Sequence, residues 1–322
     1  MSESELHVVP DEMKAGARHL RDLAGLLVEP FVTGAVLACE GSPAEADLAD
    51  RGYDGSWGRP TFQVVHQAAN HVNVVSDHLH AMSAVILARE TVLAVSTLSR
   101  TVLESLSVLN WLYEPEIDIQ ERIRRRYNIR LLTLREQRNL VRGFVSAGDP
   151  RSGVATGSLE KIGQEVLTIK SNAKRFGLDY KAARTRVAGL DPMRYLGQRV
   201  PSDQKLIDAL LATSASSGNR IGLAMHRITS ATAHGQSHGS QFFMLEAVDS
   251  SEPGLGSVQF GLDLSHFSTL LGSVFLGLQN ARKRLRDYYG WPDEPWQAGL
   301  RSAMATYNGW LDIERRASEG ER

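Results

Sequence analysis

The chain has 322 residues with a formal net charge of −1, and its 42% hydrophobic and 23% charged residues are ordinary for a globular protein. This length allows a substantial buried core without disulfides or metals, and the single cysteine, Cys39, excludes an internal disulfide. The N-terminus is polar and lacks the pattern of a signal peptide, and apolar segments such as 267–278 are too short and interrupted to span a membrane. We therefore expect a cytoplasmic protein with no membrane association.

Apolar spacing predicts the elements of the first half of the chain. A helix is expected over 11–40, kinked or restarted at Pro30, and a loop over 41–60, where Gly, Pro and Asp recur. Residues 61–114 contain no Pro or Gly, so we expect two helices that meet near Glu90. The second of these is apolar nearly all round, which predicts that it is buried between other helices.

The second half continues in the same way, with an arginine-rich helix first. The arginine-rich helix covers 118–145, and a turn over 149–158 and a helix over 159–176, ending before Gly177, follow it. Residues 177–203 are predicted to be loop and short helical pieces, and 203–213 and 218–240 to be helices. The last elements are two short strands (241–248 and 256–264), a long amphipathic helix (263–289) and a short helix (297–315).

Together these elements predict an all-α, multi-helix bundle with a polar insertion and one short β-hairpin. The bundle core covers 61–290, with the insertion at about 146–203. An N-terminal helix and loop over 1–60 precede it, and a C-terminal packing tail over 291–322 follows.

Positive charge gathers in two segments. Residues 121–142 hold eight arginines against two glutamates, and residues 170–199 hold eight Lys or Arg against two aspartates. This asymmetry suits an anionic partner such as RNA, although arginines paired with acids elsewhere on a solvated helix face are the alternative. The arginines that would contact RNA are Arg122, Arg125, Arg126, Arg130, Arg135 and Arg138.

The segment 226–238, HRITSATAHGQSH, is the first candidate for chemistry. On a helical period, Arg227, Ser230, His234 and His238 fall on one face. A fixed cation beside an imidazole suits phosphoryl chemistry, because the imidazole moves a proton and the guanidinium holds phosphate charge. A role in helix capping or buried hydrogen bonding is the alternative for the histidines.

Arg100 and Glu104 form the other candidate, since they lie four residues apart in an otherwise apolar segment. Buried charges are costly unless they are paired or functional. The two side chains either satisfy each other as an (i, i+4) pair, or they face the same pocket as His234. In that pocket Glu104 would orient an imidazole, or Arg100 would bind an anion.

Histidines could also form a metal site, but the pattern is weak. Several occur in one predicted helix, and the pair His234 and His238 has the i, i+4 spacing of metal ligands but lacks the Glu of zinc peptidase helices. The candidates would be His71, His78, His80, His234 and His238. The chain has no phosphate-binding loop, dinucleotide fingerprint, serine elbow or plausible catalytic cysteine, and we expect neither cofactor nor resident metal.

Three segments resemble uncharacterised bacterial, especially actinobacterial, helical families. They are TLSRTVLESLSVLNWLYEPEIDIQERIRRRY, VPSDQKLIDALL and HRITSATAHGQSHG. The last is similar to a helix with the pattern Tyr-Arg-x-x-Ser-x-x-x-His-Gly, which Arg227, Ser230, His234 and Gly235 match. His226 departs from that pattern, since Tyr is usual there. The resemblance covers residues 90–240 and its motifs do not indicate an activity.

These families resemble, more distantly, HEPN-type helical bundles, many of which are metal-independent ribonucleases with an Arg-x(4–6)-His motif, while others are non-catalytic. By that resemblance Arg227 would hold the scissile phosphate, His234 would transfer a proton, and a homodimer would complete the site. Three hypotheses follow: a HEPN-like RNA-binding protein or ribonuclease of a toxin or defence system, a non-catalytic module that binds a protein or ligand, and a metal-dependent hydrolase. Whether the chain is an enzyme stays open at this point.

Overall fold

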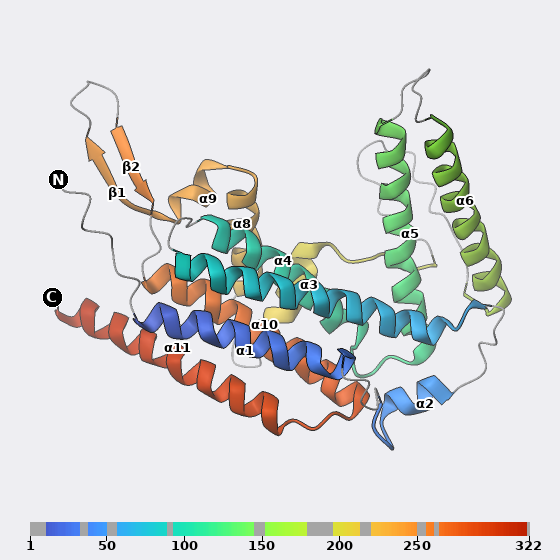
Figure 1. Ribbon diagram of the computed structural model, residues 1–322, viewed down its shortest axis with the longest axis horizontal. Helices are drawn as coiled ribbons and strands as arrows, with labels where there is room; N and C mark the ends of the chain where they lie inside the picture. Colours follow the sequence, from blue (N-terminus) through green and yellow to red (C-terminus); the bar gives the residue numbers. More distant parts are fainter. Residues whose placement is uncertain are drawn as a thin grey trace. The chain divides into compact units, whose positions relative to one another are not determined.

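The computed structural model describes residues 11–32, 38–49, 57–88, 93–144, 152–178, 196–212, 220–249, 256–260 and 264–320. The elements in these ranges are mostly α-helices, so the prediction of an all-α bundle is confirmed (Figure 1). The chain forms two compact units: unit 1 comprises residues 1–45, 68–115 and 202–322, and unit 2 comprises 46–67 and 116–201. No described helix has the length and hydrophobicity that a membrane span requires.

Unit 1 contains most of the helices and the only described strands. Its elements are α1 (Asp11–Val32), most of α3 (Pro60–Ala88), α4 (Leu93–Leu112), α7 (Asp203–Leu211), α8 (Ile221–Ala233), α9 (Ser237–Gln241), β1 (Met244–Asp249), β2 (Gly256–Phe260), α10 (Leu264–Tyr289) and α11 (Glu294–Gly320). β1 and β2 pair antiparallel, from Met244 opposite Phe260 to Asp249 opposite Gly256, with an irregularity after Met244.

Helix α4 is the buried centre of unit 1, as its apolar composition predicted. It packs against α7, α8 and α10, and buried residues from Val95 to Leu112 cover more than half of its circumference, while the face with Arg100 and Glu104 is only half-buried. Gly277 of α10 lies at this contact, where an added Cβ would come within 3.2 Å of both Leu103 and Leu210. The small residue therefore lets α10 approach α4 and α7 closely. Helix α8 packs on the same helix α4.

The segment after α10 is anchored by a buried cation. The Arg282 guanidinium carbon lies 4.7 Å from the ring centre of Trp291 and 5.7 Å from that of Trp296. Burial lowers the pKa of Arg282 to about 10. The predicted tail therefore begins with buried tryptophans, and it continues as the long helix α11, which packs on α1 and α10.

Unit 2 is built around α5 (Ile119–Phe144) and α6 (Ser152–Arg175), which pack against each other. Trp57 stacks on Tyr127 and on Phe176, with ring centres 5.0 and 5.2 Å apart, and so joins the segment 46–67 to both helices. Because of these contacts, α5 belongs to the same unit as α6. The structure thus differs from the predicted single core over 61–290.

Other boundaries also differ from the predictions. The expected loop 41–60 contains the short helix α2 (Pro43–Ala49), and α6 begins at Ser152, within the expected turn. The expected helix 218–240 is two helices, α8 and α9. The predicted break near Glu90 and most of the segment 177–203 lie outside the described residues.

Candidate functional site

The C-terminal end of α8 places His234. The helix closes with His234 as its C-cap and Gly235 in the left-handed region, at φ 64°. The Gln236 N–H donates to Ala231 O at 2.9 Å and the Gly235 N–H donates to Thr232 O at 3.1 Å, which is the pattern of a Schellman motif. The His-Gly pair is therefore a helix stop that leaves the imidazole at the edge of the fold.

Arg100 connects α4 to this end of α8. Its Nε donates to Glu104 Oε1 at 2.6 Å, and its Nη1 donates to Ser230 Oγ at 3.1 Å. The same Nη1 lies 3.4 Å from His234 Nε2. Residues about 130 positions apart in the sequence thus form one polar cluster, which we call the Arg100 cluster: Arg100, Glu104, Ser230 and His234.

The Arg100 cluster is accessible to solvent. The Arg100 and Glu104 side chains are 20% and 30% exposed, and His234 is exposed. A guanidinium has donors only, so a hydrogen bond from Arg100 to His234 requires an Nε2 that carries no proton. The arrangement therefore presents a cation next to an imidazole lone pair at a position that a solute can reach.

The structure separates the predicted site residues Arg100, Glu104, Arg227 and His234 into two groups. It brings Arg100, Glu104 and His234 together, and Glu104 binds Arg100 instead of the imidazole. Arg227 is exposed on α8 and makes no polar contact with this group among the described residues. Ser230 is a further member of the group, and its place on the same helix face as His234 was the sequence signal for it.

His238 and His226 occupy different settings. The prediction that His238 shares a helix face with His234 is wrong, because α8 ends at Ala233 and His238 lies on α9. His226 is half-buried, and its Nδ1 is buried without a hydrogen-bond partner within the described part of the chain. His226 therefore has the half-buried environment of a packing residue.

Metal ligation finds no support in the described ranges, where no group of three His, Cys, Asp or Glu side chains is placed to hold an ion. Of the histidines on α3, His78 donates through Nδ1 to Val74 O at 2.9 Å, and His80 is exposed. We propose no metal site.

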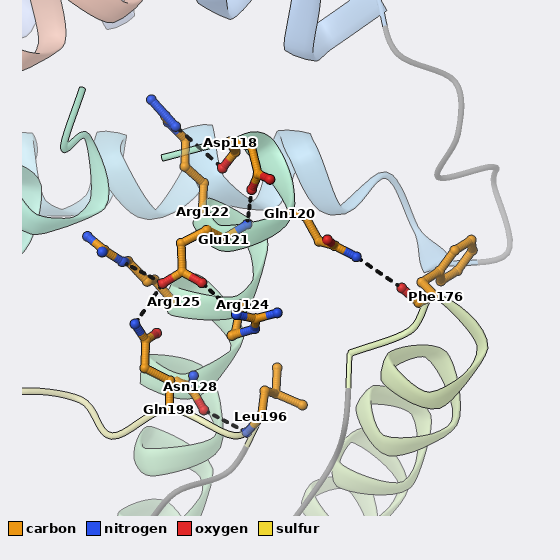
Figure 2. Close-up of polar contacts among 10 residues, drawn as sticks. All are labelled: Asp118, Gln120, Glu121, Arg122, Arg124, Arg125, Asn128, Phe176, Leu196 and Gln198. Atoms are coloured by element: carbon orange, nitrogen blue, oxygen red, sulfur yellow. Dashed lines mark hydrogen bonds and ion pairs between the residues drawn. The ribbon is translucent and has the colours of Figure 1, made fainter. Parts of the chain in front are cut away.

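The arginines of α5 are largely engaged inside unit 2. Arg122, Arg125 and Arg126 are buried. Figure 2 shows Glu121 accepting from Arg124, Arg125 and Gln198, while Arg122 reaches the backbone oxygen of Asp118. Asn128 Oδ1 accepts from the Leu196 N–H at 2.9 Å, so the segment 196–198 lies along this face of α5 (Figure 2).

The remaining arginines expected to contact RNA are more exposed, but two of the three are paired. Arg130 makes two bonds of 2.6 Å to Glu165 of α6, and Arg135 binds Glu136. Arg138 is exposed. Most of the charge that suggested an RNA surface on α5 therefore serves contacts within unit 2.

Comparisons with protein-family models, with curated proteins and with solved structures gave no match to this chain. A function must therefore be inferred from the chemistry of the Arg100 cluster and its surroundings.

Proposed function

We propose that the chain is a HEPN-like, metal-independent ribonuclease whose active site is the Arg100 cluster together with Arg227. The observation that carries the proposal is the position of Arg100 Nη1, within 3.1 Å of Ser230 Oγ and 3.4 Å of His234 Nε2. A fixed guanidinium beside an accessible imidazole is a combination suited to phosphodiester cleavage.

Substrate would bind first through Arg100. The 3.4 Å contact to His234 is long, and the imidazole is exposed, so a phosphate oxygen can replace Nε2 as the partner of Nη1. Glu104 holds the guanidinium by its Nε and leaves Nη1 directed at Ser230 and His234. Arg227, exposed on the same helix as His234, would add a second cation to the bound phosphate.

Cleavage would then use the released lone pair of His234. Nε2 takes the proton of the ribose 2′-OH, and the 2′-oxygen attacks phosphorus as negative charge develops beside Arg100. The bond from phosphorus to the 5′-oxygen breaks, and that oxygen takes a proton from water. The products are a 2′,3′-cyclic phosphate and a 5′-hydroxyl, and no metal or cofactor takes part.

Incubation of total RNA with the protein in excess EDTA tests the proposal. Wild type should produce fragments with cyclic phosphate ends, and His234→Ala should lose activity by two orders of magnitude or more. His238→Ala is the matched control, because this exposed histidine lies on α9 outside the cluster. Equal activity of wild type and His234→Ala, or none in either, would contradict the proposal.

A non-catalytic binding module is the second candidate, and one observation favours it. Arg100 already has partners in Glu104, Ser230 and His234, and these contacts tie α4 to α8 as a structural link would. In that case Arg100→Ala should lower the thermal stability of the protein, and wild type and His234→Ala should both leave RNA uncut. The same EDTA assay, accompanied by thermal unfolding of both variants, separates the two candidates.

A further inference from the structure

Helix α8 presents a line of cationic groups to solvent beyond the cluster. Arg220, Arg227 and His234 are exposed and follow one another at seven-residue intervals, with Arg220 as the N-cap and His234 as the C-cap. Seven residues bring a helix back to nearly the same direction and advance it by about 10 Å. The three residues therefore follow one another along one side of α8 and its two caps, and we call this row the α8 track.

The opposite side of α8 is packed, so the α8 track faces outward. Gly222 lies against α7, where a Cβ would come within 2.4 Å of the Asp208 Cα. Met225, Thr229 and Thr232 continue this buried side. On the helix, the track residues lie well over 90° from Gly222.

Acidic residues are absent from α8 itself and from the segments next to it. Of the acidic residues on the helices packed against α8, Glu104 is paired with Arg100, and Asp208 lies at the Gly222 side, away from the track. The segment 209–245 contains no Asp or Glu, although it carries Arg220 and Arg227 as well as three histidines. Within the described residues, neither arginine forms an ion pair, which contrasts with the paired arginines of α5. The charge on this face is therefore available to an anionic ligand.

From this arrangement we infer that the α8 track binds single-stranded RNA, and that Arg220 holds a phosphate several nucleotides away from the bond cleaved at His234. The inference rests on the proposed function for its choice of RNA. Arg220 and His234 are separated by 14 positions, about 20 Å along a helix, so only an oligonucleotide can reach both. A dinucleotide would occupy the cluster alone.

Binding can be measured without cleavage by using a fluorescent 2′-O-methyl dodecanucleotide and fluorescence anisotropy at several salt concentrations. Arg220→Ala should weaken binding and reduce the slope of log K against log salt by about 0.7, the contribution of one single-strand phosphate contact. Arg220→Lys should keep most of the slope. Arg301→Ala is the matched control, because Arg301 is an exposed arginine of unit 1 on α11.

Cleavage in EDTA then compares a dinucleotide with a dodecanucleotide. Wild type should prefer the longer substrate in kcat/KM, and Arg220→Ala should remove that preference and leave dinucleotide cleavage unchanged. If the salt dependence of RNA binding changes in Arg220→Ala but RNA is never cut, RNA binding by the α8 track is supported and the ribonuclease proposal is contradicted. If cleavage requires His234 but Arg220→Ala has the same salt dependence and length preference as wild type, RNA binding by the α8 track is refuted and the ribonuclease proposal is retained.

Two further outcomes would overturn the inference. One is a wild-type protein that does not bind the dodecanucleotide at low salt. The other is displacement of the RNA by polyglutamate at equal charge concentration, which would show a surface for acidic proteins.

Discussion

The backbone of Gly239 in α9 lies directly against that of Thr232 in α8. A Cβ on Gly239 would come within 2.3 Å of the Thr232 nitrogen, and Thr232 Oγ1 donates to Gly239 O at 3.3 Å. This contact folds α9 back onto α8 immediately after the Gly235 stop. The position of His234 between the two helices therefore depends on a residue without a side chain.

Gly239→Ala should consequently destabilise the protein by about 1–3 kcal/mol, because backbone atoms cannot move aside for the new methyl group. Chemical unfolding followed by circular dichroism measures the change. Gly25→Ala is the control: Gly25 lies exposed in α1 with no atom near its Cβ position, so the same substitution should add about 0.5–1 kcal/mol of stability. Equal effects at both positions would contradict the close contact.

Glu104→Gln tests how Arg100 is held. Glutamine can still accept from Arg100 Nε, but the charge-assisted bond of 2.6 Å becomes a neutral one. If the chain cleaves RNA as proposed, we expect kcat to fall by about 3–10-fold and the melting temperature to stay nearly constant. A loss of melting temperature without a specific loss of kcat would indicate that Glu104 serves only to join the helices.

Several features of unit 1 were accessible from the sequence. The apolar composition of 91–113 predicted a buried helix, and the spacing of Arg100 and Glu104 allowed the (i, i+4) bond that the structure contains. The proximity of Arg100 to His234 was one of two open alternatives, because it depends on how α4 packs on α8. Gly235 is a helix-stop signal in the sequence, and in the structure it ends α8 before His238.

Burial of the α5 arginines could not be inferred from residue type. Arg126 donates through Nε to the backbone oxygen of Gln63, and Arg122 reaches the backbone oxygen of Asp118. Backbone acceptors become available only when the chain is folded, and any residue can supply them. A dense run of arginines thus resembled a nucleic-acid surface. Of the six arginines that the sequence suggested as RNA contacts, three are buried inside unit 2, namely Arg122, Arg125 and Arg126.

Arg125 and Arg126 should respond differently to replacement by methionine. Arg125→Met removes a bond of 2.9 Å to the poorly exposed Glu121 and should cost about 1–3 kcal/mol. Arg126→Met should change stability by less than about 1 kcal/mol, because burial lowers the pKa of Arg126 and its Nη1 has no partner among the described residues. Urea titration measures both. An equal large loss in the two variants would contradict this ranking.

The phenol of Tyr127 should make unit 2 sensitive to alkali. Burial raises the pKa of Tyr127 to about 12, against an ordinary value of 10.0, so its stabilising contribution is complete below pH 10 and disappears as the pH rises toward 12. Over that range wild type should lose about 1.4 kcal/mol per pH unit relative to Tyr127→Phe, which cannot ionise. Urea unfolding at pH 8, 10 and 11 provides the comparison, and absorbance at 295 nm should show the same number of tyrosines ionising near pH 10 in both proteins. A wild-type protein with one more tyrosine ionising near pH 10 than the variant would show that Tyr127 is open to solvent, in conflict with its stacking on Trp57.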